Sequence, residues 1–371
     1  MIIENSIDIT GALKSVTRTA YDLKDFYEFT FVLPRKSKGR FWIEEKGFTS
    51  IVELPMKEIS RRFSSIVLYV PLLLMNTIRL RRLLKKEKID LIHVNDLYNL
   101  LPPMLWLLGC KIPYVCHVRF LPNRFPPSLF NFWLHTHLRY ANRLIAVSKS
   151  VLEMLPNSPK IELIHNELPI EERYPQRLQI NDQKETYIFL YLSNFMKGKG
   201  QDFALQAFAK IHDQLPAWKI RFVGGDMGLI KNKNYREHLM EKAQALGIFD
   251  KTEWKGFTED VESEYKQADV VLNFSESESF SITCLEALFF GMPLIATDCG
   301  GPAEIIDHNH SGILVPNKDV NAMSREMLRL ALNNERRDIM GAVARTSVRE
   351  KFSIEKTSFR LKEVYDQVYN T

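Results

Sequence analysis

Short apolar runs recur along the whole chain, and each is followed by a turn and then by apolar residues at helical spacing. Runs without a polar face are typical of parallel strands, because helices cover both sides of such a sheet. The predicted strands cover residues 2–3, 29–33, 51–54, 91–94, 114–118, 144–148, 161–164, 187–192, 220–223, 271–273 and 294–296. Strand and helix alternate up to a last helical stretch at 354–369. The pattern predicts an α/β protein with two doubly wound domains facing each other across a cleft.

The length of 371 residues suits two domains better than one, because a single core stops growing well below that size. A polar and charged segment at 170–186 is the place where few contacts are expected to cross. We therefore predict a first domain at 1–177 and a second at 178–353.

Charge is distributed unevenly between these halves. Residues 1–177 contain 26 Lys and Arg against 17 Asp and Glu, or +9, and the remainder has 24 against 28, or −4, which together give the net charge of +5. No acidic residue lies between Asp96 and Glu153. A basic half beside a mildly acidic one implies that the first domain faces an anionic partner.

Two segments of the basic half leave alternatives open. Residues 58–88 are predicted to be helical, interrupted at Pro71, with an apolar run at 66–75 followed by clustered Lys and Arg. This run is too short to span a bilayer, so it either lies on an anionic membrane or is a core helix with a solvated basic end. Residues 119–140 mix aromatic, proline and arginine residues. They form either an exposed loop for a lipid interface or an acceptor, or a loop folded onto its own domain.

The remaining bulk features concern localisation. The N-terminus has no basic region followed by a long apolar core, so no signal peptide is expected. Four cysteines without metal-ligand spacing are expected to be reduced. No known nucleic-acid-binding module is present, and we expect no nucleic-acid partner. The prediction is a cytoplasmic protein, peripheral at the inner face of the membrane through its first domain.

The stretch 271–304 carries the candidate chemistry. It is predicted to be strand, loop, helix, strand, glycine turn and helix, so two helices begin where a strand has just ended. Such helix starts attract anions, and ligands of α/β sheets bind beyond the carboxyl ends of the strands. Glu278 in the loop and Glu286 in the helix would face one pocket from two heights. Thr283 and Glu286 also fit a capping box with Gly291 as the C-terminal stop, so spacing alone leaves a structural interpretation open.

The ordered string Glu278-Ser279-Phe280-Ser281-Ile282-Thr283-Cys284-Leu285-Glu286-Ala287 resembles Glu-Gly-Phe-Gly-x-x-x-Leu-Glu-Ala, the signature of retaining glycosyltransferases of family 4. Residues 291–293, 300–304 and 312–316 match further motifs of that family. The resemblance implies the GT-B fold, with an acceptor-binding first domain, a nucleotide-sugar-binding second domain, and a C-terminal helix at about 354–371 packed on the first. It implies a hexosyltransferase that needs no metal and no cofactor, consistent with the absence of an Asp-x-Asp motif.

The resemblance also assigns residues. The catalytic residues that it implies are Glu278, His117 and Lys199. The donor-binding residues that it implies are Gly11, Asn194, Lys199, Phe280, Ser281, Ile282 and Glu286. Lys199 would meet the diphosphate, Glu286 the ribose and Glu278 the transferred sugar, while Asn166 matches a further family asparagine. His93, His308 and His310 are interpreted as ordinary structural histidines.

The chain departs from the family pattern at Ser279 and Ser281, which replace glycines, and at Asn194, which replaces an arginine. One cation on the diphosphate is then missing unless Lys197 supplies it. The departures motivate an alternative, a non-catalytic GT-B partner in a glycan-assembly complex. A nucleotide-sugar epimerase is a second alternative, and a glycosidase using both glutamates is a third. Donors based on UDP, GDP and ADP remain equally compatible with the sequence, as do lipid-linked and growing glycan acceptors.

Overall fold

A computed structural model describes residues 1–56, 63–166 and 184–370, which form two compact units. The first unit contains 1–56, 63–166 and 354–370, and the second contains 184–353. The predicted boundary between residues 177 and 178, and the predicted helix start at 58, lie outside the described residues. Within the described ranges, every helix is too short or too polar to cross a membrane.

The first unit is built on a parallel sheet with the order β3-β2-β1-β4-β5-β6-β7. Its strands are β1 (Ile2–Ile3), β2 (Phe31–Pro34), β3 (Ile51–Leu54), β4 (Ile92–Val94), β5 (Tyr114–Val118), β6 (Arg143–Ala146) and β7 (Ile161–Leu163). Its helices are α1 (Gly11–Asp22), α2 (Gly39–Glu45), α3 (Phe63–Lys86), α4 (Leu101–Leu107), η1 (Pro122–Arg124), α5 (Pro127–Tyr140), α6 (Lys149–Leu152), η4 (Ile354–Lys356) and α14 (Ser358–Tyr369). The sheet is doubly wound, as the apolar runs predicted.

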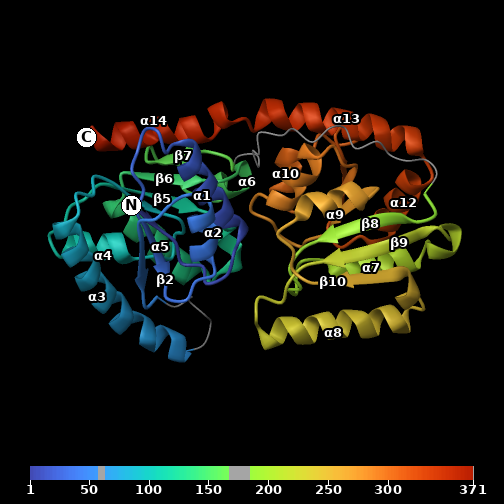
Figure 1. Ribbon diagram of the computed structural model, residues 1–371, viewed down its shortest axis with the longest axis horizontal. Coiled ribbons are helices and arrows are strands. Elements are labelled where there is room, and N and C mark those ends of the chain that lie inside the picture. The colour runs from blue at the N-terminus through green and yellow to red at the C-terminus, as the bar shows by residue number, and fades with distance from the viewer. Residues whose placement is uncertain (57–62, 167–183, 371) are drawn as a thin grey trace. The chain divides into compact units, whose positions relative to one another are not determined.

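Helix α14 returns from the far end of the chain to the first sheet, beside β6 and β7 in Figure 1. It buries Leu361, Val364 and Val368 against Val115 of β5 and Ile145 of β6. The C-terminal helix is therefore part of the first core.

The second unit contains a parallel sheet with the order β10-β9-β8-β11-β12-β13. Its strands are β8 (Tyr187–Leu192), β9 (Trp218–Val223), β10 (Thr252–Lys255), β11 (Val270–Asn273), β12 (Leu294–Thr297) and β13 (Ile313–Val315). Its helices are α7 (Gln201–Ala209), η2 (His212–Gln214), α8 (Ile230–Ala245), η3 (Phe249–Lys251), α9 (Val261–Gln267), α10 (Ile282–Phe289), α11 (Pro302–Ile305), α12 (Val320–Ala331) and α13 (Asn334–Lys351). Figure 1 shows α9 and α10 on the opposite side of this sheet from α7 and α8. Edge strands β10 and β13 were not predicted; in β10, three of the four residues are polar and all four are only half-buried.

One local prediction is wrong, and the structure decides between the two alternatives for residues 119–140. Helix α3 runs through Pro71 without the predicted interruption. The segment 119–140 is mostly helical, and Phe120, Phe130 and Trp133 are buried in the first unit. The interpretation as a segment folded onto its own domain is therefore confirmed, because most of its aromatic surface is removed from water. Phe132 is the exception, with 56% of its surface exposed.

Candidate functional site

Three glycines bring the strand ends of the second unit into close contact. A Cβ atom at Gly200 would lie 1.9 Å from the carbonyl oxygen of Phe274, and one at Gly224 would lie 2.0 Å from that of Ser193. At Gly301, a Cβ atom would lie 2.2 Å from the backbone of Phe280. No side chain fits at these positions, so glycine lets the loops after β8, β9, β11 and β12 meet at one edge of the sheet.

Lys199 and Glu278, predicted from two distant motifs, meet at this edge. Lys199 Nζ lies 2.7 Å from Glu278 Oε1, and the hydroxyl of Ser275 donates to the same oxygen at 2.8 Å. Both side chains are mostly buried, with 24% and 14% of their surfaces exposed. A partly desolvated ion pair is oriented more strongly than a surface pair, because water screens it less. The pair therefore holds an ammonium group in a fixed place.

The buried hydroxyl of Tyr191 joins the two loops that carry this pair. It donates to the carbonyl of Lys199 at 2.5 Å and accepts the amide of Phe274 at 2.7 Å. Burial raises the pKa of Tyr191 well above its usual value, so the hydroxyl stays protonated. Tyr191 thus fixes the lysine loop to the end of β11.

The loop of Glu278 is held from its other side by the turn after β12. The Glu278 amide donates to Cys299 at 3.2 Å, and the Gly301 amide donates to the Glu278 carbonyl at 2.9 Å. This short bridge holds the backbone of Glu278 beside the first turn of α10.

Helix α10 begins two residues earlier than the capping-box interpretation requires. Ser281 is its N-cap: Ser281 Oγ accepts from the Cys284 amide at 3.4 Å, and the Asn273 side chain donates to Ser281 Oγ at 3.0 Å. The box built on Thr283 and Glu286 is therefore wrong, because Glu286 lies in the second turn and cannot reach the cap. The predicted stop at Gly291 is confirmed by its φ of +70° and by the bond from Met292 to Ala287 that closes the helix end.

Ser281, which stands where the family pattern has glycine, adopts a backbone conformation that favours glycine. Its φ is +84°, in the left-handed region that L-residues rarely occupy. The hydroxyl, bonded as N-cap and to Asn273, offsets part of the strain of about 1–2 kcal/mol. A serine at this position is therefore compatible with the left-handed backbone conformation of the loop.

The other predicted donor-binding residues of the second unit fall into two groups. Phe280 and Ile282 flank the N-cap, and the Phe280 ring packs edge-on against Phe352 at 5.5 Å, so its side chain belongs to the core. Glu286 is buried on α10 beside Tyr265, and burial together with the Glu286 carboxylate raises the pKa of that tyrosine. Glu286 is thus oriented from its own domain, while the N-cap region offers backbone groups.

Asn194 has a structural partner. Its side-chain oxygen accepts the Gly225 amide at 3.1 Å, and its carbonyl accepts from Gln201 at 2.9 Å. The asparagine side chain thus joins the end of β8 to the glycine turn after β9. An arginine side chain could not accept this hydrogen bond, because a guanidinium group has no acceptor. Lys197, the proposed substitute cation, is exposed in the same loop.

The first unit carries the two remaining predicted residues. Gly11 is the first residue of α1, whose N-cap Thr10 accepts the Leu13 amide at 3.2 Å. His117 lies on β5 and is 4% exposed. Its Nδ1 lies 2.5 Å from Nε2 of His93 on the neighbouring strand. His93, interpreted from sequence as an ordinary histidine, is therefore in direct contact with a predicted catalytic residue.

Sequence reasoning missed a polar chain at the carboxyl edge of the first sheet. Arg119 donates to Asn95 at 2.6 Å and to Asn166 at 2.7 Å, and Asn95 also bonds to the buried carboxylate of Glu4. Ser15 on α1 donates to Asn166 at 3.0 Å. One signal was available: Glu4 and Asn95 are the first polar residues after β1 and β4, and Arg119 follows β5 directly. Only the sheet order shows that these three strands are neighbours.

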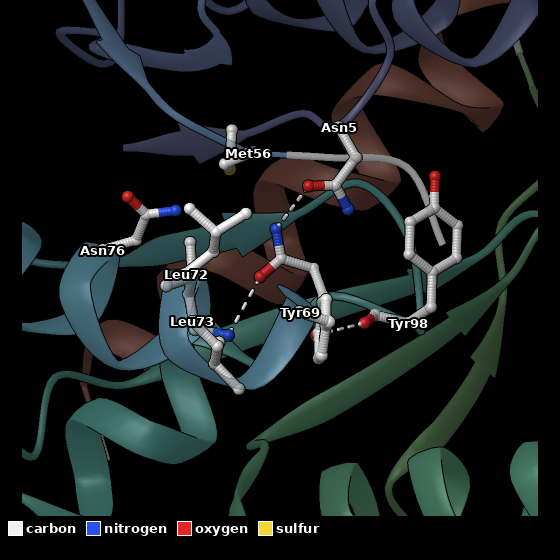
Figure 2. Close-up of a pocket in the computed structure, with 9 residues that line it drawn as sticks. Asn5, Met56, Tyr69, Leu72, Leu73, Asn76 and Tyr98 are labelled. Carbon is white, nitrogen blue, oxygen red and sulfur yellow. Dashed lines mark hydrogen bonds between the residues drawn. The ribbon is translucent and has the colours of Figure 1, made fainter. Parts of the chain in front are cut away.

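A small cavity next to this edge separates α3 from the loops after β1 and β4 (Figure 2). The side-chain amide of Asn99 donates to the side-chain oxygen of Asn5 at 2.8 Å, and the Tyr69 hydroxyl of α3 donates to the carbonyl of Tyr98 at 3.1 Å. The cavity volume of about 30 Å³ is room for one or two water molecules and not for a sugar. These contacts anchor the inner face of α3.

Two family models match contiguous parts of the chain. Glycosyltransferase Family 4 matches residues 51–171, and Glycosyl transferases group 1 matches residues 172–347. Among curated proteins, N-acetyl-alpha-D-glucosaminyl L-malate synthase of Bacillus anthracis is 29% identical over 65% of this chain. The chain spans 64% of that relative's length. D-inositol 3-phosphate glycosyltransferase of Saccharomonospora viridis is 30% identical over 52% of this chain and 46% of its own.

Solved structures share the fold at low sequence identity. HepE of Anabaena in complex with UDP and glucose has a TM-score of 0.83 at 18% identity, covering 98% of both chains. Sucrose-phosphate synthase of Thermosynechococcus elongatus has a TM-score of 0.79 at 18% identity, covering 100% of this chain and 98% of its own. Both likenesses concern the complete two-domain fold.

Proposed function

Because the chain belongs to glycosyltransferase family 4 and has the GT-B fold, we propose that it transfers a sugar, with retention, from a nucleotide-sugar donor to a lipid-linked or growing glycan acceptor. The observation that carries the proposal is the Lys199–Glu278 pair of 2.7 Å in loops that meet beside the first turn of α10. A fixed ammonium group and the backbone amides of a helix N-terminus suit a diphosphate.

In the proposed reaction, the acceptor hydroxyl attacks the anomeric carbon on the face from which the diphosphate leaves. The bond from that carbon to the phosphate oxygen breaks, and the same oxygen takes the hydroxyl proton. Lys199 and the α10 amides meet the charge that develops on the leaving diphosphate, so the step needs neither a second carboxylate nor a metal ion. Glu278 contacts the transferred sugar and Glu286 holds the ribose, while His117 is the catalytic residue assigned to the first unit.

Nucleotide binding is the first test. A nucleoside diphosphate of the correct base, at 100 times its dissociation constant, stabilises the fold by about 2.7 kcal/mol. We expect one of UDP, GDP and ADP to raise the melting temperature by about 5 °C or more. Glu286→Gln, which keeps the side-chain shape but removes the charged acceptor for the ribose hydroxyls, should roughly halve that rise. No rise with any of the three nucleotides would contradict the proposal.

We place the acceptor at a membrane surface because of the outer face of α3. Val70, Leu74 and Ile78 form a stripe at four-residue spacing and are 54%, 45% and 48% exposed. The exposed cations Arg81 and Lys85 continue the same stripe. The inner face of the helix is anchored in the first unit, so the stripe is free to insert into the headgroup region of an anionic bilayer.

Vesicle sedimentation tests this surface. The protein should sediment with vesicles that contain phosphatidylglycerol and remain in solution with pure phosphatidylcholine. Ile78→Glu should lower the partition coefficient about 10-fold, because it removes an inserted apolar group and adds a repelled charge. Ile230→Glu is the control, since Ile230 is 79% exposed at the start of α8 in the second unit. An equal loss of vesicle binding in both variants would show that the α3 stripe is not the membrane-binding surface.

A further inference from the structure

Three buried side chains of the first unit form a continuous hydrogen-bonded chain that ends at His117. The hydroxyl of Tyr365 on α14 lies 2.5 Å from His93 Nδ1, and His93 Nε2 lies 2.5 Å from His117 Nδ1. The two imidazole rings are neighbours on β4 and β5, with centroids 4.7 Å apart. Tyr365, His93 and His117 are 5%, 1% and 4% exposed, so the protein itself, and not bulk water, orients this chain.

Both histidines of the chain are neutral. Burial, with the positive charge of Arg119 as the next cause, lowers the pKa of His93 and of His117 well below the usual value. A neutral imidazole has one nitrogen that donates and one that accepts. In a chain of two neutral rings, the proton position on one ring therefore dictates the proton position on the other.

The Tyr365 hydroxyl selects between the two possible directions of donation along these hydrogen bonds. A phenol is a strong donor and a weak acceptor, so Tyr365 donates to His93 Nδ1. His93 then carries its proton on Nε2 and donates to His117 Nδ1. His117 is left with its proton on Nε2, the nitrogen outside the chain, where it can donate to an oxygen atom.

We propose that Tyr365 and His93 are positioning residues that fix His117 as the tautomer protonated at Nε2, a neutral hydrogen-bond donor for a sugar or phosphate oxygen. The catalytic significance of this tautomer rests on the role of His117 in the proposed function. The assignment of the tautomer is independent of that function, because it follows from contacts within the first unit.

The placement of Tyr365 depends on the return of α14 to the first sheet. The helix is held by its apolar residues in the first core and by a hydrogen bond from Tyr27 to Asp366, next to Tyr365 in the sequence. The rings of Tyr27 and Tyr365 pack edge-to-face with centroids 5.6 Å apart. Tyr365, on the C-terminal helix, thereby determines which ring nitrogen of His117 carries the proton.

Tyr365→Phe and Tyr27→Phe are a matched pair for the test. Each removes one hydroxyl from the same helix interface and keeps the ring, but only the first removes a member of the chain. Side-chain NMR of the full-length protein labelled with ¹⁵N-histidine reports which nitrogen of each ring is protonated. We expect one tautomer of His117 in the wild type and in Tyr27→Phe, and a mixture in Tyr365→Phe, with melting temperatures of the two variants within about 2 °C of each other.

Transfer kinetics provide the second measurement. Tyr365→Phe should lower kcat about 10-fold, the effect of one hydrogen bond, with KM for the donor nearly unchanged, and Tyr27→Phe should retain activity. An unchanged His117 tautomer in Tyr365→Phe, or protonation at Nδ1 in the wild type, would overturn the proposal. Absence of transfer by the wild type, together with the expected tautomers, would instead overturn only the proposed function.

Discussion

Replacing Lys199 with methionine is expected to lower the rate of sugar transfer about 1,000-fold, because one preorganised charge on a leaving oxygen is worth that much in a desolvated site. Methionine keeps the length of the side chain and removes only the ammonium group. Glu278→Gln should lower the rate of transfer about 100-fold, since it removes the carboxylate that orients Lys199 from 2.7 Å away. Rates are measured with the selected donor and membrane extract as acceptor source, in buffer containing EDTA.

Lys197→Met is the control for both variants. Lys197 lies in the same loop but is exposed, so its loss should change the rate by no more than about threefold. A 1,000-fold loss in this variant would mean that Lys197 supplies the cation and that Lys199 has been assigned wrongly. Transfer by the wild type that is lost in the EDTA buffer but present in the same buffer without EDTA would, in contrast, overturn the metal-free reaction.

The same assay separates the alternative functions. Nucleotide binding without transfer to any acceptor would indicate a non-catalytic partner protein. The structure offers reasons for two of the departures that suggested this alternative: Asn194 joins two strand ends, and Ser281 keeps a φ of +84°. Conversion of the nucleotide sugar without an acceptor would indicate an epimerase, and hydrolysis of a plain glycan without nucleotide would indicate a glycosidase.

Gly200→Ala is expected to lower the free energy of unfolding by about 3 kcal/mol or more. The change combines a positive φ of +79° with a Cβ placed 1.9 Å from the Phe274 carbonyl oxygen, and backbone on both sides cannot move without separating β8 from β11. Urea denaturation followed by tryptophan fluorescence measures the loss, since Trp218 and Trp254 lie in the second unit.

Gly198→Ala separates the steric clash from the backbone strain. Gly198 lies two residues earlier with a φ of +91°, but no atom lies within 4 Å of its added Cβ. Gly198→Ala should lower the free energy of unfolding by only about 1–2 kcal/mol, which is the strain of an L-residue in the left-handed region. Similar losses at both positions would show that the close approach of Gly200 to Phe274 does not exist in solution.

The class of fold and the candidate site residues follow from the sequence without the structure. Apolar runs without a polar face predict buried parallel strands, because periodicity is a local property that each segment carries alone. The Glu278–Glu286 string and Lys199 were predicted from ordered motifs, which are also local in the sequence. The capping-box interpretation shows the limit of such patterns. Spacing favoured Thr283 as the cap, but the backbone conformation of Ser281 and the bond from Asn273 to its hydroxyl make Ser281 the cap.

Tertiary structure alone decided which residues meet. Lys199 and Glu278 are 79 positions apart, and Tyr365 and His93 are 272 apart, so no local pattern relates them. Their meeting depends on the strand order, in which β8 pairs with β11 and β4 with β5, and on the return of α14. His93 has the sequence environment of an ordinary core histidine. It acquires a role only because parallel pairing places it beside His117 and helix packing places a phenol at its other nitrogen.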